Sequence, residues 1–168
     1  MKVIYDMKTA RLEISNLKDS DKEEFFYNVA NDKKVLETFI CKYEESLENF
    51  DFAPYLNMSN MFAIRLNYTG KLIGIILHFA VENDAIEIGY CIGSKYWNNG
   101  YATEALKVFL NYCFKEKVAA KIYASYFAGN DSSGRVMEKC GMKYDRLVEN
   151  GIEYQGLKRD LIYYVIEK

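Results

Sequence analysis

The sequence predicts an α+β fold in which a mostly antiparallel sheet of about six or seven strands is flanked by helices. Two observations lead to this prediction. Strand-like runs follow one another with turn-forming residues between them, and an amphipathic helical segment interrupts them at residues 102–113. Because two strands joined through a helical crossover pair in parallel, one parallel pair is expected within the sheet.

The first third of the chain begins with an alternating run, Arg11–Leu17, which predicts the first strand. Ser20–Glu23 has the spacing of a capping box and predicts a helix that continues to about Asn31. The segment Leu36–Leu56 is aromatic and acidic, and it predicts one or two short helices that end near Pro54.

Three strand-like runs follow in the middle of the chain. They are Met61–Tyr68, Leu72–Val81 and Ala85–Ile92, separated by Thr69-Gly70 and by Glu82-Asn83-Asp84. Both separators have turn chemistry. An antiparallel meander is therefore expected.

The last part of the chain alternates helix and strand. Apolar residues recur at helical spacing and predict a helix with one face on the sheet: Ala102, Ala105, Leu106, Phe109, Leu110 and Cys113. Lys121–Tyr126 is expected as a strand parallel to the third strand of the meander. Asp131–Lys139 predicts a short helix that Gly141 ends, and two final strands are expected around a tight turn at Asn150-Gly151.

Composition limits the kind of protein. The 168 residues, half of them hydrophobic, are sufficient for a single domain over residues 1–168 that buries roughly 70% of the unfolded chain's surface. Lys and Arg number 22 against 24 acidic residues, a formal charge of −2. No stable binding of nucleic acid is therefore expected.

Cysteine and histidine usage argues against metal and disulfide chemistry. The four cysteines contain no CxxC pair, and His78 is the single histidine, so neither a zinc site nor a disulfide framework is expected. The sequence also contains no signal-peptide pattern and no run approaching the ~20 apolar residues of a membrane span. We expect a cytoplasmic protein without a membrane partner.

The most informative segment, residues 85–110, runs from a strand pattern through a glycine turn into the amphipathic helix. Because the first N–H groups of a helix lack intrahelical partners and carry partial positive charge, this junction predicts a phosphate site. It is not a P-loop, because Tyr101 follows Gly100, and it is not GxGxxG, because the glycines of the segment, Gly89, Gly93 and Gly100, do not have that spacing. The small Ala102 lets a ligand approach the backbone.

These residues resemble a known family. The run EIGYCIGSKYWNNGYATEAL, residues 87–106, is similar to the acetyl-CoA motif of the GCN5-related N-acetyltransferases (GNAT), in the ribosomal-protein-alanine acetyltransferase branch (RimJ/RimL-like). The chain has the same residues as the motif of that branch at eight positions: Tyr96, Trp97, Gly100, Tyr101, Ala102, Thr103, Glu104 and Ala105.

The resemblance continues in order from about residue 9 to residue 166. Thr9-Ala10-Arg11-Leu12 resembles the opening strand of the branch, and Gly70–Gly74 resembles its hairpin in the middle of the sheet. The segment Asn130–Met142 resembles the second cofactor motif, and Gly156–Tyr163 the closing strand. The implied fold is the GNAT fold, with a splayed parallel strand pair that holds acetyl-CoA.

The chain departs from the family pattern at three positions. Trp97 stands where the wider family has Arg or Gln, and Asn98 stands where the branch often has Gly. Because the turn binds phosphate through backbone N–H groups, these two changes leave the cofactor prediction in place. Met137 stands where many relatives have the tyrosine that protonates the departing thiolate, so the identity of the acid is open.

The resemblance implies a set of cofactor-binding residues. The backbone at Tyr90, Cys91 and Ile92 is expected to bind the pantetheine arm and to offer an N–H to the thioester oxygen. The pyrophosphate is assigned to the amides of six consecutive residues: Asn98, Asn99, Gly100, Tyr101, Ala102 and Thr103. Asn130 is expected to bind the pantetheine arm, and Lys139 to reach the nucleotide end.

Acetyl transfer to an amine needs a base and an acid. Glu87 is the candidate base, because a single charged residue between Ile86 and Ile88 in an apolar strand suggests a functional role. Burial would raise the pKa of its carboxyl group and so suit it to accept a proton. A solvent-facing Glu87, or one paired with a lysine, is the alternative. Ser133 is the candidate acid, and its alternative role is to cap the short helix.

Other features have structural explanations that compete with functional ones. The aromatic residues Phe50, Phe52 and Tyr55 fit the core better than an acceptor pocket. A Cys–His pair formed by Cys91 and His78 is disfavoured because nothing orients the imidazole. An acidic cluster before Pro54 fits a solvated helix face better than an amine-attracting site, and its members are Glu44, Glu45, Glu48 and Asp51.

The sequence thus predicts a bacterial N-acetyltransferase that moves an acetyl group from acetyl-CoA to a primary amine by direct transfer in a ternary complex. The amine is a protein N-terminus or a small molecule. Two alternatives remain, a non-catalytic acyl-CoA-binding or regulatory module and a transferase that uses a longer acyl-CoA. The family resemblance also leaves a homodimer open.

Overall fold

The computed structural model describes residues 7–168, in which eight strands and five α-helices form. The hydrogen-bonded strand order is β1-β2-β3-β4-β5-β6-β8-β7, and β5 (Ile86–Ile92) is parallel to β6 (Lys121–Phe127). The predicted α+β class with one parallel pair is confirmed. The strand beyond the predicted number is β1 (Met7–Lys8), which is too short to show a pattern in sequence. The chain divides into two compact units, residues 7–77 with 90–112 and residues 78–89 with 113–168.

The first unit contains the antiparallel strands of the N-terminal half and most of the long helix. Its strands are β1, β2 (Leu12–Asn16), β3 (Met61–Leu66) and most of β4 (Leu72–Ala80). Its helices are α1 (Lys22–Phe25), α2 (Lys33–Leu36), α3 (Ala53–Leu56) and most of α4 (Tyr101–Lys115). Each of the pairs β1–β2, β2–β3 and β3–β4 is antiparallel.

An aromatic cluster forms part of the core of the first unit. Phe25 lies 5.2 Å from Phe52 and 4.6 Å from Tyr55 between ring centroids, and Phe50 is 2% exposed. Residues from the loop before α3 therefore fill the core, as the sequence favoured. A buried ion pair between Arg65 and Asp21, with Nη2 to Oδ2 at 2.6 Å, joins β3 to the turn before α1.

Two predicted helix limits in this unit are wrong. The first helix begins with a 3₁₀ turn at Asp19–Asp21 rather than at a Ser20 cap, because the Lys18 N–H donates to Asp21 Oδ2 at 2.7 Å. The short α1 then continues as a π-helical turn, Phe26–Ala30. Pro54 lies in the first turn of α3 instead of near the end of a helix, since a residue without an N–H is tolerated there.

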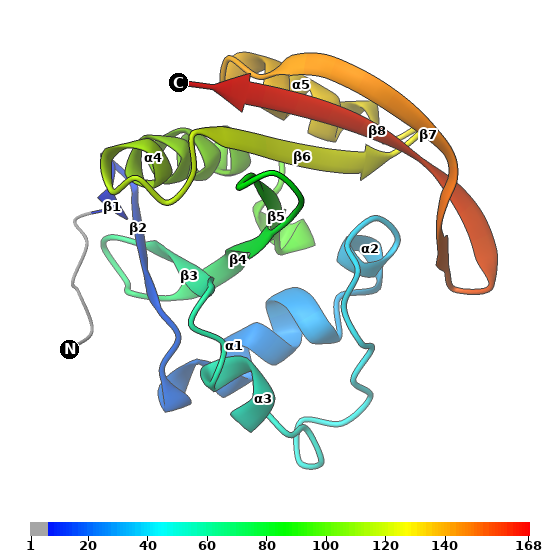
Figure 1. The fold of residues 1–168 in the computed structure, drawn as a ribbon. Helices are drawn as coiled ribbons and strands as arrows, with labels where there is room; N and C mark the ends of the chain where they lie inside the picture. Colours follow the sequence, from blue (N-terminus) through cyan, green and yellow to red (C-terminus); the bar gives the residue numbers. More distant parts are fainter. Residues whose placement is uncertain (1–6) are drawn as a thin grey trace. The chain divides into compact units, whose positions relative to one another are not determined.

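The second unit contains the C-terminal strands and α5 (Asp131–Lys139), whose limits match the prediction. Strand β6 pairs antiparallel with β8 (Leu157–Glu167), and β8 pairs antiparallel with β7 (Lys143–Tyr154). Figure 1 shows β7 and β8 as a long hairpin in orange and red. After α5 the chain turns at Gly141, which has φ +84°, a value that glycine adopts without strain.

The final hairpin turns at a different place from the one predicted. Gln155 and Gly156, with φ +52° and +74°, connect β7 to β8, whereas Asn150 and Gly151 lie within β7. The register between β7 and β8 shifts there, and the Asn150 N–H donates to Asp160 Oδ1 at 2.8 Å. The Asn-Gly pair therefore forms an irregularity inside a strand, stabilised by a residue of the partner strand.

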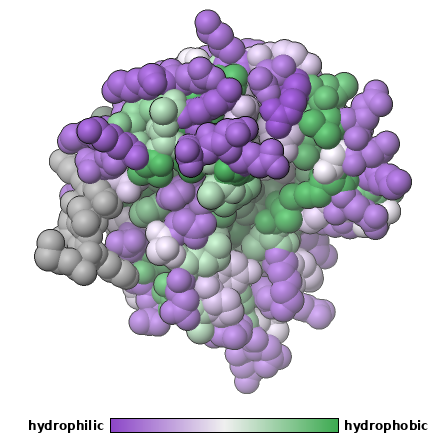
Figure 2. Space-filling model, in the orientation of Figure 1, coloured by the Kyte–Doolittle hydropathy of each residue, from purple (hydrophilic) through white to green (hydrophobic). Residues whose placement is uncertain are grey.

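The surface is mixed in character. Figure 2 shows hydrophilic side chains spread over the viewed face, with smaller apolar areas among them. Within residues 7–168, no helix has both the length and the apolar content needed to cross a membrane.

Candidate active site

The glycine turn between β5 and α4 has a fixed shape. A short 3₁₀ turn, Ser94–Tyr96, is followed by Asn98 and Gly100, both in the left-handed region with φ +61° and +78°. Trp97 Nε1 donates to the Ile92 carbonyl oxygen at 2.7 Å, so the indole joins the end of β5 to the turn. The Trp97 side chain thus has a structural role at the position where the wider family has Arg or Gln.

Two further contacts stabilise this turn. The Asn99 side chain donates to the carbonyl oxygens of Tyr96 and Trp97 at 3.0 and 2.9 Å, inside the turn itself. The Ser94 N–H donates to Asp32 Oδ2 at 2.7 Å, and the same aspartate caps α2. Residues from two different parts of the first unit therefore determine the backbone path before α4.

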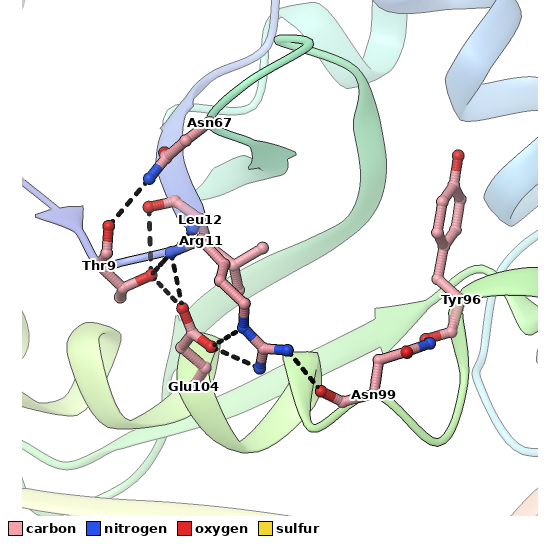
Figure 3. A network of polar contacts seen from close by, with 7 residues as sticks. All are labelled: Thr9, Arg11, Leu12, Asn67, Tyr96, Asn99 and Glu104. Atoms are coloured by element: carbon pink, nitrogen blue, oxygen red, sulfur yellow. Dashed lines mark hydrogen bonds and ion pairs between the residues drawn. The ribbon is translucent and has the colours of Figure 1, made fainter.

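A third connection comes from the start of β2, and Figure 3 shows it. Arg11 donates from Nε to Glu104 Oε2 at 2.8 Å and from Nη1 to the Asn99 carbonyl oxygen at 2.8 Å. The Thr9 hydroxyl donates to the other oxygen of Glu104. The Arg11 guanidinium also lies 4.6 Å from the centroid of the Tyr101 ring. One arginine thus connects the turn to the first residues of α4.

The first turn of α4 is suited to an anion. The Glu104 N–H donates to the Gly100 carbonyl oxygen at 3.1 Å, and the N–H groups of the first turn of any helix point away from the helical hydrogen bonds that follow. Partial burial alone would raise the pKa of Glu104, but its hydrogen bonds with Thr9 and Arg11 hold that pKa below the ordinary value. Its negative charge near the helix N-terminus stabilises the helix.

The end of β5 lies close to β4. The Gly93 N–H donates to the Ile73 carbonyl oxygen at 2.8 Å, and a Cβ atom placed on Gly74 would lie 2.1 Å from the Cys91 carbonyl oxygen. Because peptide groups alternate along a strand, those of Tyr90 and Ile92 face away from β4. The parallel register with β6 ends at Ile88 and Ala124, although β5 continues to Ile92.

The cysteine of this segment is not arranged as a nucleophile. Cys91 is buried, and burial raises the pKa of its thiol, which disfavours the reactive thiolate. Burial also lowers the pKa of His78.

The candidate base, Glu87, lies in the second unit among polar residues of neighbouring strands. The Ser125 hydroxyl donates to Glu87 Oε1 at 2.6 Å, so the carboxylate has a serine rather than a lysine as its partner. Burial raises the pKa of Glu87, while the bond from Ser125 and the charge of Arg146 oppose that shift. Glu87 is therefore half-buried and has a pKa above that of an ordinary carboxyl group.

Two residues of the C-terminal hairpin extend this group. The strand registers place Ser125 opposite Tyr163 and Tyr163 opposite Arg146. The Arg146 guanidinium lies 4.2 Å from the Tyr163 ring centroid and 5.3 Å from that of Tyr123, the residue opposite Glu87. Burial and the nearby Glu87 raise the pKa of the Tyr163 hydroxyl.

The candidate acid, Ser133, lies at the start of α5. Asn130 donates from Nδ2 to Ser133 Oγ at 3.0 Å, and the Ser132 hydroxyl donates to Asn130 Oδ1 at 2.9 Å. Helix α5 packs on the face of β6 that carries Tyr126, because a Cβ on Gly134 would lie 2.6 Å from the Tyr126 hydroxyl. Adjacent residues of a strand face opposite sides, so this is not the face that carries Ser125 and Glu87.

The remaining candidates have simple structural surroundings. Lys139 is exposed in the last turn of α5. In the acidic cluster, Glu44 pairs with Lys42 at 2.9 Å, and Asp51 accepts a bond from the Ala53 N–H at 3.1 Å at the start of α3. Within residues 7–168, no group of three or more His, Cys, Asp or Glu side chains is placed to hold a metal ion.

Sequence reasoning missed the partners of both candidate sites. Arg11 and Glu104 belong to separate sequence motifs, and no local pattern indicates their contact. Tyr163 and Arg146 reach Glu87 through strand registers that only the folded sheet defines. The sequence signal for the second contact is a basic residue, Arg146, two positions after Tyr144 in the first of the two expected final strands.

Comparisons with known proteins agree with this geometry. A family model described as an acetyltransferase (GNAT) domain matches residues 11–143. An uncharacterized N-acetyltransferase of Bacillus subtilis, YoaA, is 27% identical over 178 aligned residues, which cover 96% of each chain. A solved GNAT-family acetyltransferase from Bacillus anthracis has a TM-score of 0.83 and 29% identity, over 95% of this chain and 96% of that one.

RimJ of Mycobacterium smegmatis, solved in complex with CoA-disulfide, has a TM-score of 0.78 over 93% of this chain and 81% of that one. The two sequences are 19% identical, so this likeness shows the fold alone.

Proposed function

Because the chain belongs to the GNAT family of acetyl-CoA-dependent acetyltransferases, we propose that it transfers the acetyl group of acetyl-CoA to a primary amine. The transfer is direct, in a ternary complex, without a covalent acetyl-enzyme and without a metal. The observation that carries this proposal is the turn at Asn98–Thr103, whose backbone is stabilised by Arg11 and Glu104 at the N-terminus of α4.

The proposed donor site uses backbone more than side chains. The amides of Asn98 to Thr103 bind the pyrophosphate, since a helix N-terminus favours anions. Tyr90, Cys91 and Ile92 bind the pantetheine arm, and the strand alternation that turns Tyr90 and Ile92 away from β4 supports this role. Asn130 bonds the same arm, and Lys139 reaches the nucleotide.

Glu87 is the proposed base. Its raised pKa suits a group that must take a proton near neutral pH, and its bond from Ser125 keeps one carboxylate oxygen in place. The proton leaves the ammonium group for Glu87, directly or through one water. The neutral amine then attacks the thioester carbon, and a backbone N–H of the β5 end stabilises the resulting oxyanion.

Ser133 is the proposed acid for the departing thiolate. Its oxygen accepts a bond from Asn130, which leaves its own O–H proton available for donation. Ser133 on α5 and Glu87 on β5 act on different groups of the reaction centre, the departing thiolate and the attacking amine. Met137, 1% exposed in α5, has no proton to donate.

The cost of deprotonation ranks the acceptors. At pH 7 an α-amine with a pKa near ~8 loses its proton for about 1.4 kcal/mol, whereas a lysine amine near ~10.4 requires about 4.6 kcal/mol. The first cost is the smaller one, and a half-buried glutamate whose pKa is raised by burial is suited to it. We therefore assign an α-amine, of a protein N-terminus or of a small molecule, as the acceptor.

One rival function has an observation in its favour. A buried methionine at position 137, where many relatives have the catalytic tyrosine, is what a non-catalytic acyl-CoA-binding or regulatory module would tolerate. A transferase of longer acyl groups is the other alternative. Competition between acetyl-CoA and succinyl-CoA for the protein separates the acyl preferences.

The test is release of free CoA thiol from acetyl-CoA with a panel of primary amines. We expect amine-dependent release that falls by about 10²-fold or more in Glu87→Gln, the range of general base catalysis. The exposed variant Lys158→Gln on β8 is the control and keeps native activity. Binding of acetyl-CoA without turnover of any amine, and with no effect of Glu87→Gln, contradicts the proposal and favours the regulatory module.

A further inference from the structure

A row of polar and aromatic side chains crosses the sheet of the second unit on one face. The strand registers place Glu87 opposite Tyr123, and Ser125, two residues further along the same strand, opposite Tyr163. Tyr163 lies opposite Arg146 of β7. Because opposite residues and residues two apart share a face, all five side chains of the row project to the same side of the sheet.

Arg146 extends back along this row toward Glu87. Its guanidinium lies 4.2 Å from the centroid of Tyr163 on the next strand and 5.3 Å from that of Tyr123, one strand further. These two rings determine where the charge is placed, since guanidinium groups stack on aromatic faces. Tyr123 is itself opposite Glu87, so the cation lies close to the strand that carries the candidate base.

The guanidinium keeps the capacity to bind a further anion. Its contact with Asp145 uses Nη1, and a guanidinium has five N–H donors in a planar fork. The Arg146 side chain is 49% exposed, so a ligand can reach the other donors. Its charge acts on Glu87, because it opposes the rise in the pKa of that carboxyl group.

The spacing matches a short acceptor. Neighbouring strands lie about 4.8 Å apart, so a guanidinium above Tyr123 and Tyr163 is about one to two strand spacings from Glu87. A peptide spans at most about 3.5 Å per residue, and a hydrogen bond of about 3 Å at each end adds to that reach, so the amine and carboxylate of an amino acid or a dipeptide bridge this separation. A second ammonium group at the same position would be repelled by Arg146.

We propose that Arg146 is a specificity-determining residue that binds a carboxylate of the acceptor, so that the preferred acceptor carries a primary amine and a carboxylate a few bonds apart. Amino acids and dipeptides belong to this class, and polyamines do not. The inference rests on the proposed function, because it assigns the acceptor side of the same site. It also explains why a positive charge stands beside a base whose substrate is an ammonium ion.

Two acceptors that differ only in the carboxylate test this inference: alanyl-alanine and its C-terminal amide. Both have an α-amine with a pKa near ~8, so the cost of deprotonation is closely matched. Thiol release with acetyl-CoA should give a kcat/KM at least about tenfold higher for the free acid, as a charged hydrogen bond supplies. Calorimetric binding of the same pair to the CoA-saturated protein, without acetyl transfer, should show a similar preference in Kd.

Three variants complete the test. Arg146→Gln should reduce the ratio between acid and amide to about one, whereas Arg146→Lys should keep part of it, because a lysine retains the charge but not the planar fork. Lys158→Gln, which removes a cation from the far end of the same hairpin, should keep the full ratio. Melting temperatures of all variants with acetyl-CoA verify that each one is folded.

The outcomes separate this inference from the proposed function. A preference for the free acid in binding, lost in Arg146→Gln, supports the inference even where no amine is turned over, a result that would contradict only the proposed function. Equal binding and turnover of acid and amide by the native protein, or stronger turnover of a polyamine such as spermidine, overturns the inference while leaving acetyl transfer intact.

Discussion

Arg11 at the start of β2 binds Glu104 in the first turn of α4 through two guanidinium nitrogens, with Nε and Nη2 at 2.8 and 2.6 Å from Oε2. The same guanidinium donates to the carbonyl oxygen of Asn99 inside the turn. A pair that is distant in sequence thus holds the backbone that we assign to the pyrophosphate. Its effect on function should therefore appear in donor binding before it appears in the chemical step.

Replacing Arg11 with Gln should raise the KM for acetyl-CoA by about tenfold, the effect of losing a charged hydrogen bond, with a smaller change in the KM for the amine. Steady-state kinetics with each substrate varied in turn measures both constants. The exposed variant Lys158→Gln is the matched control. An Arg11→Gln variant with a native KM for acetyl-CoA and a lower kcat would show that the pair has no role in shaping the donor site.

The pH dependence of transfer should reveal Glu87. Because burial raises the pKa of this carboxyl group, kcat/KM should fall on the acid side at a pH above the ordinary carboxyl range. Below that pKa the protonated group cannot accept the amine proton. The bond from Ser125 opposes the rise in pKa, so Ser125→Ala should move this acid limb to higher pH.

Two comparisons check this assignment. Glu87→Gln should lose the acid limb together with most of the activity, since no carboxylate remains to titrate. The decisive measurement is kcat/KM from pH 4 to 9 for the native protein and both variants. An acid limb that stays in place in Ser125→Ala would assign the titration to another group.

The close approach of β4 and β5 makes Gly74 sensitive to substitution. A Cβ there would lie 2.1 Å from the Cys91 carbonyl oxygen, which is backbone and cannot move away on its own. Gly74→Ala should therefore reduce the free energy of unfolding by about 1–3 kcal/mol or more, as overpacking does. Ala80→Ser at the exposed end of the same strand should change it by less than about 0.5 kcal/mol. Urea unfolding compares the two, and equal stabilities would contradict the packing described.

The turn of the C-terminal hairpin offers a stabilising substitution. Gln155 has φ +52°, a conformation in which a long side chain is strained, whereas asparagine tolerates it and is favoured before glycine in such turns. Gln155→Asn should raise the free energy of unfolding by a few tenths of a kcal/mol to about 1 kcal/mol. Gly156→Ala, at φ +74°, should lower it, and thermal unfolding distinguishes the two signs.

Local patterns predicted much of this fold. The limits of α5 and its end at Gly141 could be predicted from sequence. Helix capping, hydrophobic periodicity and a glycine in the left-handed conformation each depend on residues only a few positions apart. The same reasoning placed the final turn at Asn150-Gly151, because an Asn-Gly pair favours a turn wherever it occurs. The choice of Gln155-Gly156 depends on the register with β8, which includes the bond from Asn150 to Asp160 and is not a local property.

The candidate site divides in the same way. The glycine turn and the isolated Glu87 were visible because each departs from its immediate surroundings in sequence. Their partners, Arg11 for the turn and Arg146 for the glutamate, come from other strands, and strand order determines those contacts. Without the strand order, the sequence therefore predicts the acetyl-CoA site more readily than the site of the amine acceptor.

Direct transfer in a ternary complex is the central claim, and initial-velocity kinetics tests it most directly. Acetyl-CoA and an amine that supports thiol release are varied together, and intact protein mass is recorded after incubation with acetyl-CoA alone. We predict intersecting double-reciprocal lines and an unmodified protein mass. Parallel lines, together with an acetylated protein that transfers its acetyl group to the amine, would contradict the account.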